Sequence, residues 1–62
     1  MMSQVDAADM LEIELSHLQK ILKEQNLVDA KLQPTEDALL SGFIRPEGSL
    51  TKRGMSLLIT VL

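Results

Sequence analysis

Residues 3–25 carry the clearest hydrophobic pattern of the chain, because apolar side chains recur there every three or four positions. On a helical wheel, one apolar seam spans about 80° and has the spacing of a coiled-coil contact. Its members are Ala8, Leu11, Leu15, Leu18 and Leu22. An adjoining arc carries Met10, Ile13, His17 and Ile21. The apolar surface is wide enough for one arc to serve the chain's own core while the other meets a partner.

The two ends of this segment carry helix signals. Ser3 followed by Asp6 has the form of a capping box. Acidic residues fill the first half of the segment and lysines lie near its end, as the helix dipole favours. Asn26 is a suitable residue for a C-terminal cap. The pattern therefore predicts one continuous helix over residues 4–25.

The second half of the chain divides into shorter pieces. Pro34 at a first-turn position, followed by Thr35 and two acidic residues, predicts a second helix over residues 34–41 that stops at Gly42. Phe43 and Ile44 are expected to be extended. Residues 45–49 predict a turn, since proline presets one backbone dihedral and glycine supplies a positive one.

The pattern of residues 55–62 is compatible with two secondary structures. Their β-branched side chains indicate a strand, whereas the leucines and a capping residue at Thr51 indicate a helix, which we favour. In either conformation this apolar tail is expected to pack against another surface.

Composition narrows the fold class. The chain has 62 residues, of which 45% are hydrophobic, with one aromatic residue and no cysteine. These values predict a single, mainly α domain over residues 1–62, in which the long N-terminal helix packs on a short C-terminal helix–turn–helix unit. A chain of this size buries only about 60% of its unfolded surface. No disulfide can support the fold, so association with another chain is the expected source of further stability.

Motifs for catalysis are missing from the sequence. The serines do not occur in a G-x-S-x-G turn, the glycines make no P-loop, and Glu14 with His17 would give only two metal ligands. We therefore expect no enzyme activity, no cofactor, no bound metal and no small-molecule substrate. No apolar run approaches the roughly 20 residues of a membrane span. Residues 1–4 do not resemble a secretory signal, so a cytoplasmic location without a membrane partner is expected.

Two short motifs lie on either side of the predicted turn: residues 39–44, Leu-Leu-Ser-Gly-Phe-Ile, and residues 50–54, Leu-Thr-Lys-Arg-Gly. Together they resemble the C-terminal part of winged-helix transcription regulators. In that family a wing separates a leucine–glycine helix end from an L-T-x-x-G helix start. The resemblance implies a degenerate winged-helix-like fold and a DNA-binding dimer. Its nucleic-acid contacts would come from Arg45, Lys52 and Arg53.

The charge distribution departs from that family pattern. The net charge is −3, and the helix predicted at the recognition position carries Glu36 and Asp37 but no basic residue. Recognition helices need donors for phosphates and base edges. Residues 1–44 hold eight acids and three bases, a charge of −5, while residues 45–62 hold three bases and one acid, a charge of +2. A basic second half keeps DNA binding as the alternative, and a winged-helix-like shape would more readily serve protein contact.

The sequence thus predicts a small non-enzymatic regulatory or adaptor protein, an inhibitor or modulator of a larger regulator, that binds a protein partner or a second copy of itself. The expected contact surface is the amphipathic N-terminal segment: Met10, Leu11, Ile13, Leu15, His17, Leu18, Ile21 and Leu22. Replacing Ile13 or Ile21 by glutamate is expected to weaken association and to leave the helix intact.

Overall fold

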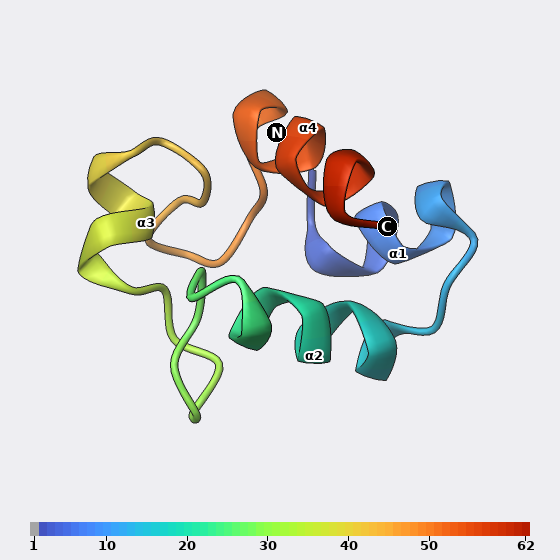
Figure 1. Ribbon diagram of the computed structural model, residues 1–62, viewed down its shortest axis with the longest axis horizontal. Helices are drawn as coiled ribbons and strands as arrows, with labels where there is room; N and C mark the ends of the chain where they lie inside the picture. Colours follow the sequence, from blue (N-terminus) through green and yellow to red (C-terminus); the bar gives the residue numbers. More distant parts are fainter. Residues whose placement is uncertain (1) are drawn as a thin grey trace.

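The protein is mainly helical, as predicted. A computed structural model describes residues 2–62 and contains α1 (Gln4–Leu11), α2 (Leu15–Glu24), α3 (Glu36–Leu40) and α4 (Lys52–Val61). Figure 1 shows α2 along one side of the molecule and α4 across from it, with α1 near one end of this pair and α3 near the other. Between residues 2 and 62, β-pairing is confined to three isolated bridges.

The prediction of one continuous helix over residues 4–25 is wrong. The chain leaves the helix after Leu11, because Glu12 adopts a left-handed conformation with φ 58°. The Glu12 amide donates to the carbonyl of Asp9 and the Ile13 amide to that of Ala8, at 3.1 and 3.0 Å. This pair of bonds is a Schellman motif, which usually has glycine at the left-handed position. A glutamate there gave no stop signal in the sequence.

The same motif ends α2, where the sequence did predict it. Asn26, with φ 59°, follows the last turn, and its amide donates to the carbonyl of Lys23. The Leu27 amide donates to the carbonyl of Leu22 at 2.9 Å. Leu22 and Leu27 are both buried, so the hydrophobic contact that accompanies a Schellman motif is part of the core here.

The short third helix begins at Glu36, two residues later than the predicted start at Pro34. Thr35 is its N-cap and accepts a hydrogen bond from the Ala38 amide, so Pro34 precedes the cap and does not occupy the first turn. The predicted end at Gly42 is confirmed, with φ 76°. The next residue, Phe43, donates its amide to the carbonyl of Ala38.

The turn and the final element follow the sequence prediction. The Arg45 amide donates to the carbonyl of Ser49 at 2.8 Å, and Ile44 pairs with Leu50 in an antiparallel bridge. Residues 52–61 are helical, so the helix alternative for the tail is correct. Thr51 caps this helix by accepting from the Gly54 amide at 3.1 Å. Gly54 packs so closely on the turn that a Cβ atom there would lie 2.0 Å from the Phe43 carbonyl oxygen.

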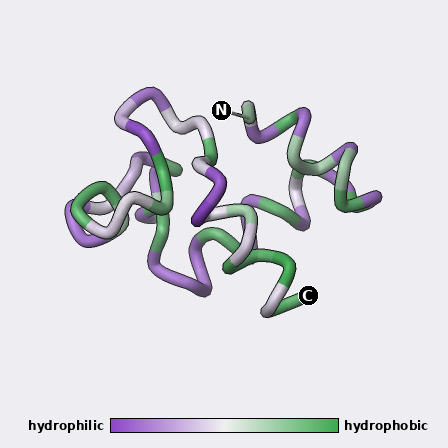
Figure 2. Tube along the Cα trace, turned by 90° about the horizontal axis from the view of Figure 1, so that it is seen from above, coloured by the Kyte–Doolittle hydropathy of each residue, from purple (hydrophilic) through white to green (hydrophobic). Residues whose placement is uncertain are grey.

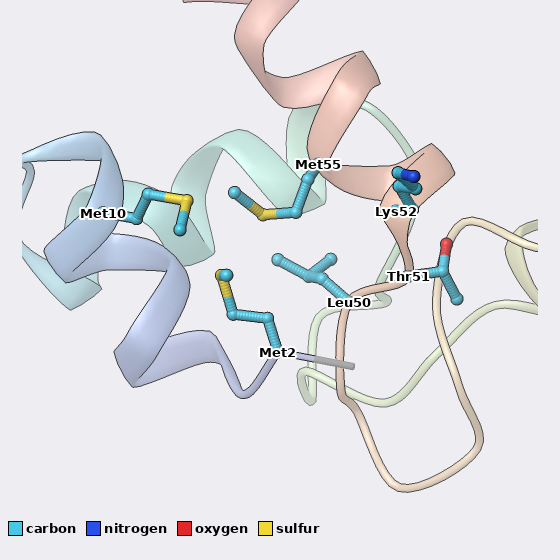
Figure 3. A pocket seen from close by; sticks show the side chains of 6 residues that line it. All are labelled: Met2, Met10, Leu50, Thr51, Lys52 and Met55. Atoms are coloured by element: carbon cyan, nitrogen blue, oxygen red, sulfur yellow. The ribbon is translucent and has the colours of Figure 1, made fainter.

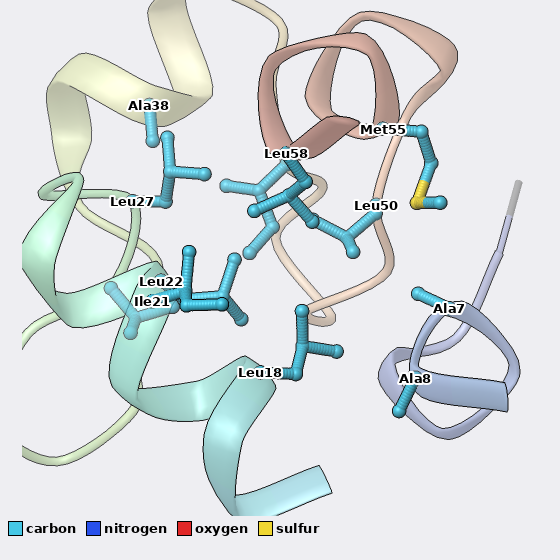
Figure 4. Packing of buried hydrophobic residues seen from close by; sticks show 12 residues of the cluster. Ala7, Ala8, Leu18, Ile21, Leu22, Leu27, Ala38, Leu50, Met55 and Leu58 are labelled. Carbon is cyan, nitrogen blue, oxygen red and sulfur yellow. The ribbon is translucent and has the colours of Figure 1, made fainter. Parts of the chain in front are cut away.

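The core lies between α2 and α4 and is closed at each end by another segment. Figure 4 shows leucines of α2 facing Leu50 and Leu58, with Ala7 and Ala8 of α1 on one side and Ala38 of α3 on the other. All are at most 3% exposed. Among residues 2–62 no polar or charged side chain is buried. Hydrophobic burial without internal polar groups therefore holds the fold together.

The left-handed conformation of Glu12 leads to a prediction about the stability of the protein. Replacing Glu12 by glycine should raise the free energy of unfolding by about 0.5–1 kcal/mol, because glycine has no Cβ to clash in the left-handed region. Urea denaturation followed by circular dichroism measures the change. The control is Lys20→Gly in the exposed middle of α2, which should lower stability by about 1 kcal/mol. A destabilised Glu12→Gly variant would contradict the helix break.

Candidate functional site

Three of the eight residues predicted to meet a partner lie in the protein's own core. Leu18 and Leu22 are fully buried, and Ile21 is 8% exposed. Figure 4 shows Leu18 and Leu22 pointing toward Leu50 and Leu58. Since contacts within the chain already cover these side chains, they are not available to a docking partner while the fold is intact.

The other five predicted residues lie closer to the surface, but they do not form one face. Leu11 and Ile13 are half-buried against the core, whereas Met10, Leu15 and His17 are exposed. The break at Glu12 separates Met10 from Leu15 and His17, which belong to a different helix. The predicted seam is therefore divided, and Met10 is the predicted contact residue that stays exposed on α1.

Met10 borders an open groove between α1 and the start of α4. The groove has a volume of about 300 Å³ and is lined by Met2, Met10, Leu50, Thr51, Lys52 and Met55. Figure 3 shows the three methionine side chains pointing toward one another around the open space, with Leu50 beside them and Lys52 at the rim. Methionine is flexible and polarizable, so such a surface adapts to differently shaped apolar partners.

An apolar stripe continues from this groove along α4. Met55, Ile59 and Leu62 are spaced four and three residues apart, which places them on one side of the helix. Met55 is mostly buried, whereas Ile59 is 61% and Leu62 is 52% exposed. Figure 2 shows that the chain ends in an apolar segment at the edge of the molecule. The expected packing of the tail is thus confirmed for Met55 and Leu58 but not for the last turn.

The α4 stripe and the methionine groove were not among the residues predicted as a contact site. The spacing of Met55, Ile59 and Leu62 is visible in the sequence, and it would have given the stripe once residues 55–62 were assigned to a helix. The groove has no local signal. Met2, Met10 and Met55 come from separate segments that only the folded chain brings together.

The three basic residues of the DNA-binding alternative lie on the turn and at the beginning of α4. Lys52 and Arg53 occupy the first turn of the helix, and both are exposed. The Arg53 guanidinium donates from Nη1 to the carbonyl of Ser41 at 3.2 Å, which ties α4 to the end of α3. Arg53 therefore has a structural partner, and Lys52 is one of the residues that line the methionine groove.

Two kinds of site are missing from the part of the chain that the structure describes. Within residues 2–62, no three histidine, cysteine or carboxylate side chains gather closely enough to hold a metal ion. No helix in the same range has the length and apolar character that crossing a bilayer requires.

The chain matches no model of a known protein family, no curated protein and no solved structure.

The burial of Ile21 changes the expected result of the glutamate substitutions. Ile21→Glu should lower the free energy of unfolding by about 3 kcal/mol or more, because it places a charge among apolar side chains without a partner. Thermal melts followed by circular dichroism would show the loss. Leu40→Glu is the matched control, since Leu40 is 80% exposed and should tolerate the charge. Equal stability of the two variants would contradict the core described above.

Proposed function

We propose that this protein is non-enzymatic and acts by binding protein chains in a regulatory or adaptor role, and that it forms a dimer with a second copy of itself through α4. The observation that carries the proposal is the apolar stripe of Met55, Ile59 and Leu62, in which Ile59 is 61% and Leu62 is 52% exposed. Met55 belongs to the buried face of α4, so Ile59 and Leu62 extend the apolar surface of the helix past the part that the core covers.

The spacing of the stripe suits a helix–helix contact. Positions four and three residues apart are the knobs of a coiled-coil seam. A second copy carries the same stripe, so two α4 helices can meet about a twofold axis with each stripe facing the other. In the antiparallel arrangement the positive end of each helix dipole lies beside the negative end of its partner, which adds a favourable term.

The size of the protein supports the same partner. A chain of 62 residues is close to the lower limit for independent stability, and oligomerisation is a common remedy. Standard interfaces bury roughly 800 Å² per partner, about a fifth of the 4106 Å² that this chain exposes. One short helix face is smaller than that. We therefore assign the adjoining groove, with Met10 on its α1 side, to the same interface.

The dimer predicts a mass of twice the 6.9 kDa monomer in light scattering behind a sizing column at micromolar concentration. Ile59→Glu should shift the protein toward the monomer, because two glutamates would meet at the twofold axis. Thr60→Glu is the control, since Thr60 is exposed on a different side of α4. It should leave the mass unchanged, and both variants should keep the circular dichroism spectrum of a folded chain. A wild-type monomer mass at all accessible concentrations would contradict self-association.

The alternative function is DNA binding by a winged-helix dimer. The observation that favours it is the pairing of Ile44 with Leu50 across the 45–49 turn, directly before α4, where such proteins carry a wing. Two observations weigh against it: α3 begins with Glu36 and Asp37, and the Arg53 side chain is engaged with the end of α3.

Gel shifts with labelled duplex DNA at about 50 mM salt decide between the two functions. Our proposal predicts no shift at protein concentrations where the dimer is complete. A shift that weakens with added salt and with Lys52→Ala would instead support the DNA-binding alternative, because phosphate contacts release counterions.

A further inference from the structure

The methionines around the groove offer more than apolar surface. Met2 lies before α1, Met10 is in the last turn of α1 and Met55 is in the first half of α4. In Figure 3 their side chains converge, and the three sulfur atoms face the space between them. Leucine would fill the same groove with similar volume. What the methionines add is three thioether sulfurs directed at one place.

Backbone hydrogen bonds anchor two of the three methionine residues at the groove. The Met2 amide donates to the carbonyl of Leu50 at 3.1 Å, and the Leu50 amide donates back to the carbonyl of Met2 at 2.7 Å. The Met55 amide donates to the Thr51 carbonyl at 2.9 Å at the start of α4. Met10 is the flexible member, since its side chain is 61% exposed. The backbone of Met2 and that of Met55 are therefore anchored at the groove, and the exposed Met10 side chain can close on an ion.

Thioether sulfur is a soft, neutral ligand that selects soft cations such as Cu(I). We propose that Met2, Met10 and Met55 bind one Cu(I) ion through their three sulfur atoms. The ion keeps its single positive charge, because no ligand has to lose a proton, and no redox step is involved in binding. In the single chain, the open groove of about 300 Å³ gives the ion access from solvent.

The surrounding charges change the affinity of this site for a cation in two opposite directions. Lys52 at the groove rim places a positive charge near the ion and opposes binding, and the −5 charge of residues 1–44 favours a cation over a longer range. Hard or borderline cations find no set of three histidine, cysteine or carboxylate ligands between residues 2 and 62. The site should therefore discriminate strongly between a soft monovalent cation and Zn²⁺.

The inference does not depend on the proposed dimer, although both use the groove. Replacing methionine by leucine separates them. The substitution keeps the apolar volume that a protein partner would contact, and it removes the sulfur that the ion requires. A Met10→Leu variant should therefore still dimerise but lose the ion.

The test uses Ag(I), which has the softness of Cu(I) and does not need a reductant. Titration of the folded chain, followed by calorimetry and by the NMR signals of labelled methionine methyl groups, should give one ion per chain. The signals of Met2, Met10 and Met55 should shift together. Met10→Leu and Met55→Leu should each weaken binding by about tenfold or more, since one of three ligands is lost.

Three controls accompany the titration. His17→Gln should bind Ag(I) as the wild type does, because this exposed histidine lies outside the groove. Lys52→Ala should bind it more tightly, since a like charge is removed. Zn²⁺ should leave the three methyl signals in place. Unchanged affinity in both leucine variants, or no Ag(I) binding by the folded wild type, would overturn the proposal.

Discussion

The chain reversal between Glu12 and Leu15 is the constraint on which the rest of the structure depends. If residues 4–24 formed one straight helix, Ala7 and Ala8 would lie along the axis of α2 and could not help to close its core. The left-handed Glu12 turns the chain, and the extended backbone at Glu14 starts the second helix in a new direction. As a result α1 packs against α2 and forms one wall of the groove opposite α4.

The same type of helix end, the Schellman motif, recurs along the chain. Each of the first three helices stops at a left-handed residue followed by an apolar one: Ile13, Leu27 and Phe43. In this motif the amides of these two residues donate to carbonyls of the last helical turn, and an apolar side chain returns toward the core. The connections therefore contribute apolar side chains to the hydrophobic cluster, which holds no buried polar side chain within residues 2–62.

The parts of the fold that could be predicted from the sequence are those with a local chemical signal. Ser3 and Thr51 are capping residues with recognisable side chains, and Asn26 and Gly42 tolerate positive φ, so the corresponding helix ends were anticipated. Glu12 has no such signature, and the regular apolar spacing across it favoured a continuous helix. The methionine groove combines residues up to 53 positions apart, and helical periodicity carries no information about such contacts.

The close approach of Gly54 to Phe43 has a consequence for recognising this fold in other chains. With 2.0 Å between an added Cβ and the Phe43 carbonyl oxygen, every residue larger than glycine would displace either the turn or the first turn of α4. Helix propensity alone would favour alanine at this interior position. A glycine three residues after a capping threonine, and eleven residues after a phenylalanine that follows a glycine, is therefore a sequence marker for this turn–helix unit. A chain that shares the hydrophobic pattern but has a larger residue there would have to join its last two helices differently.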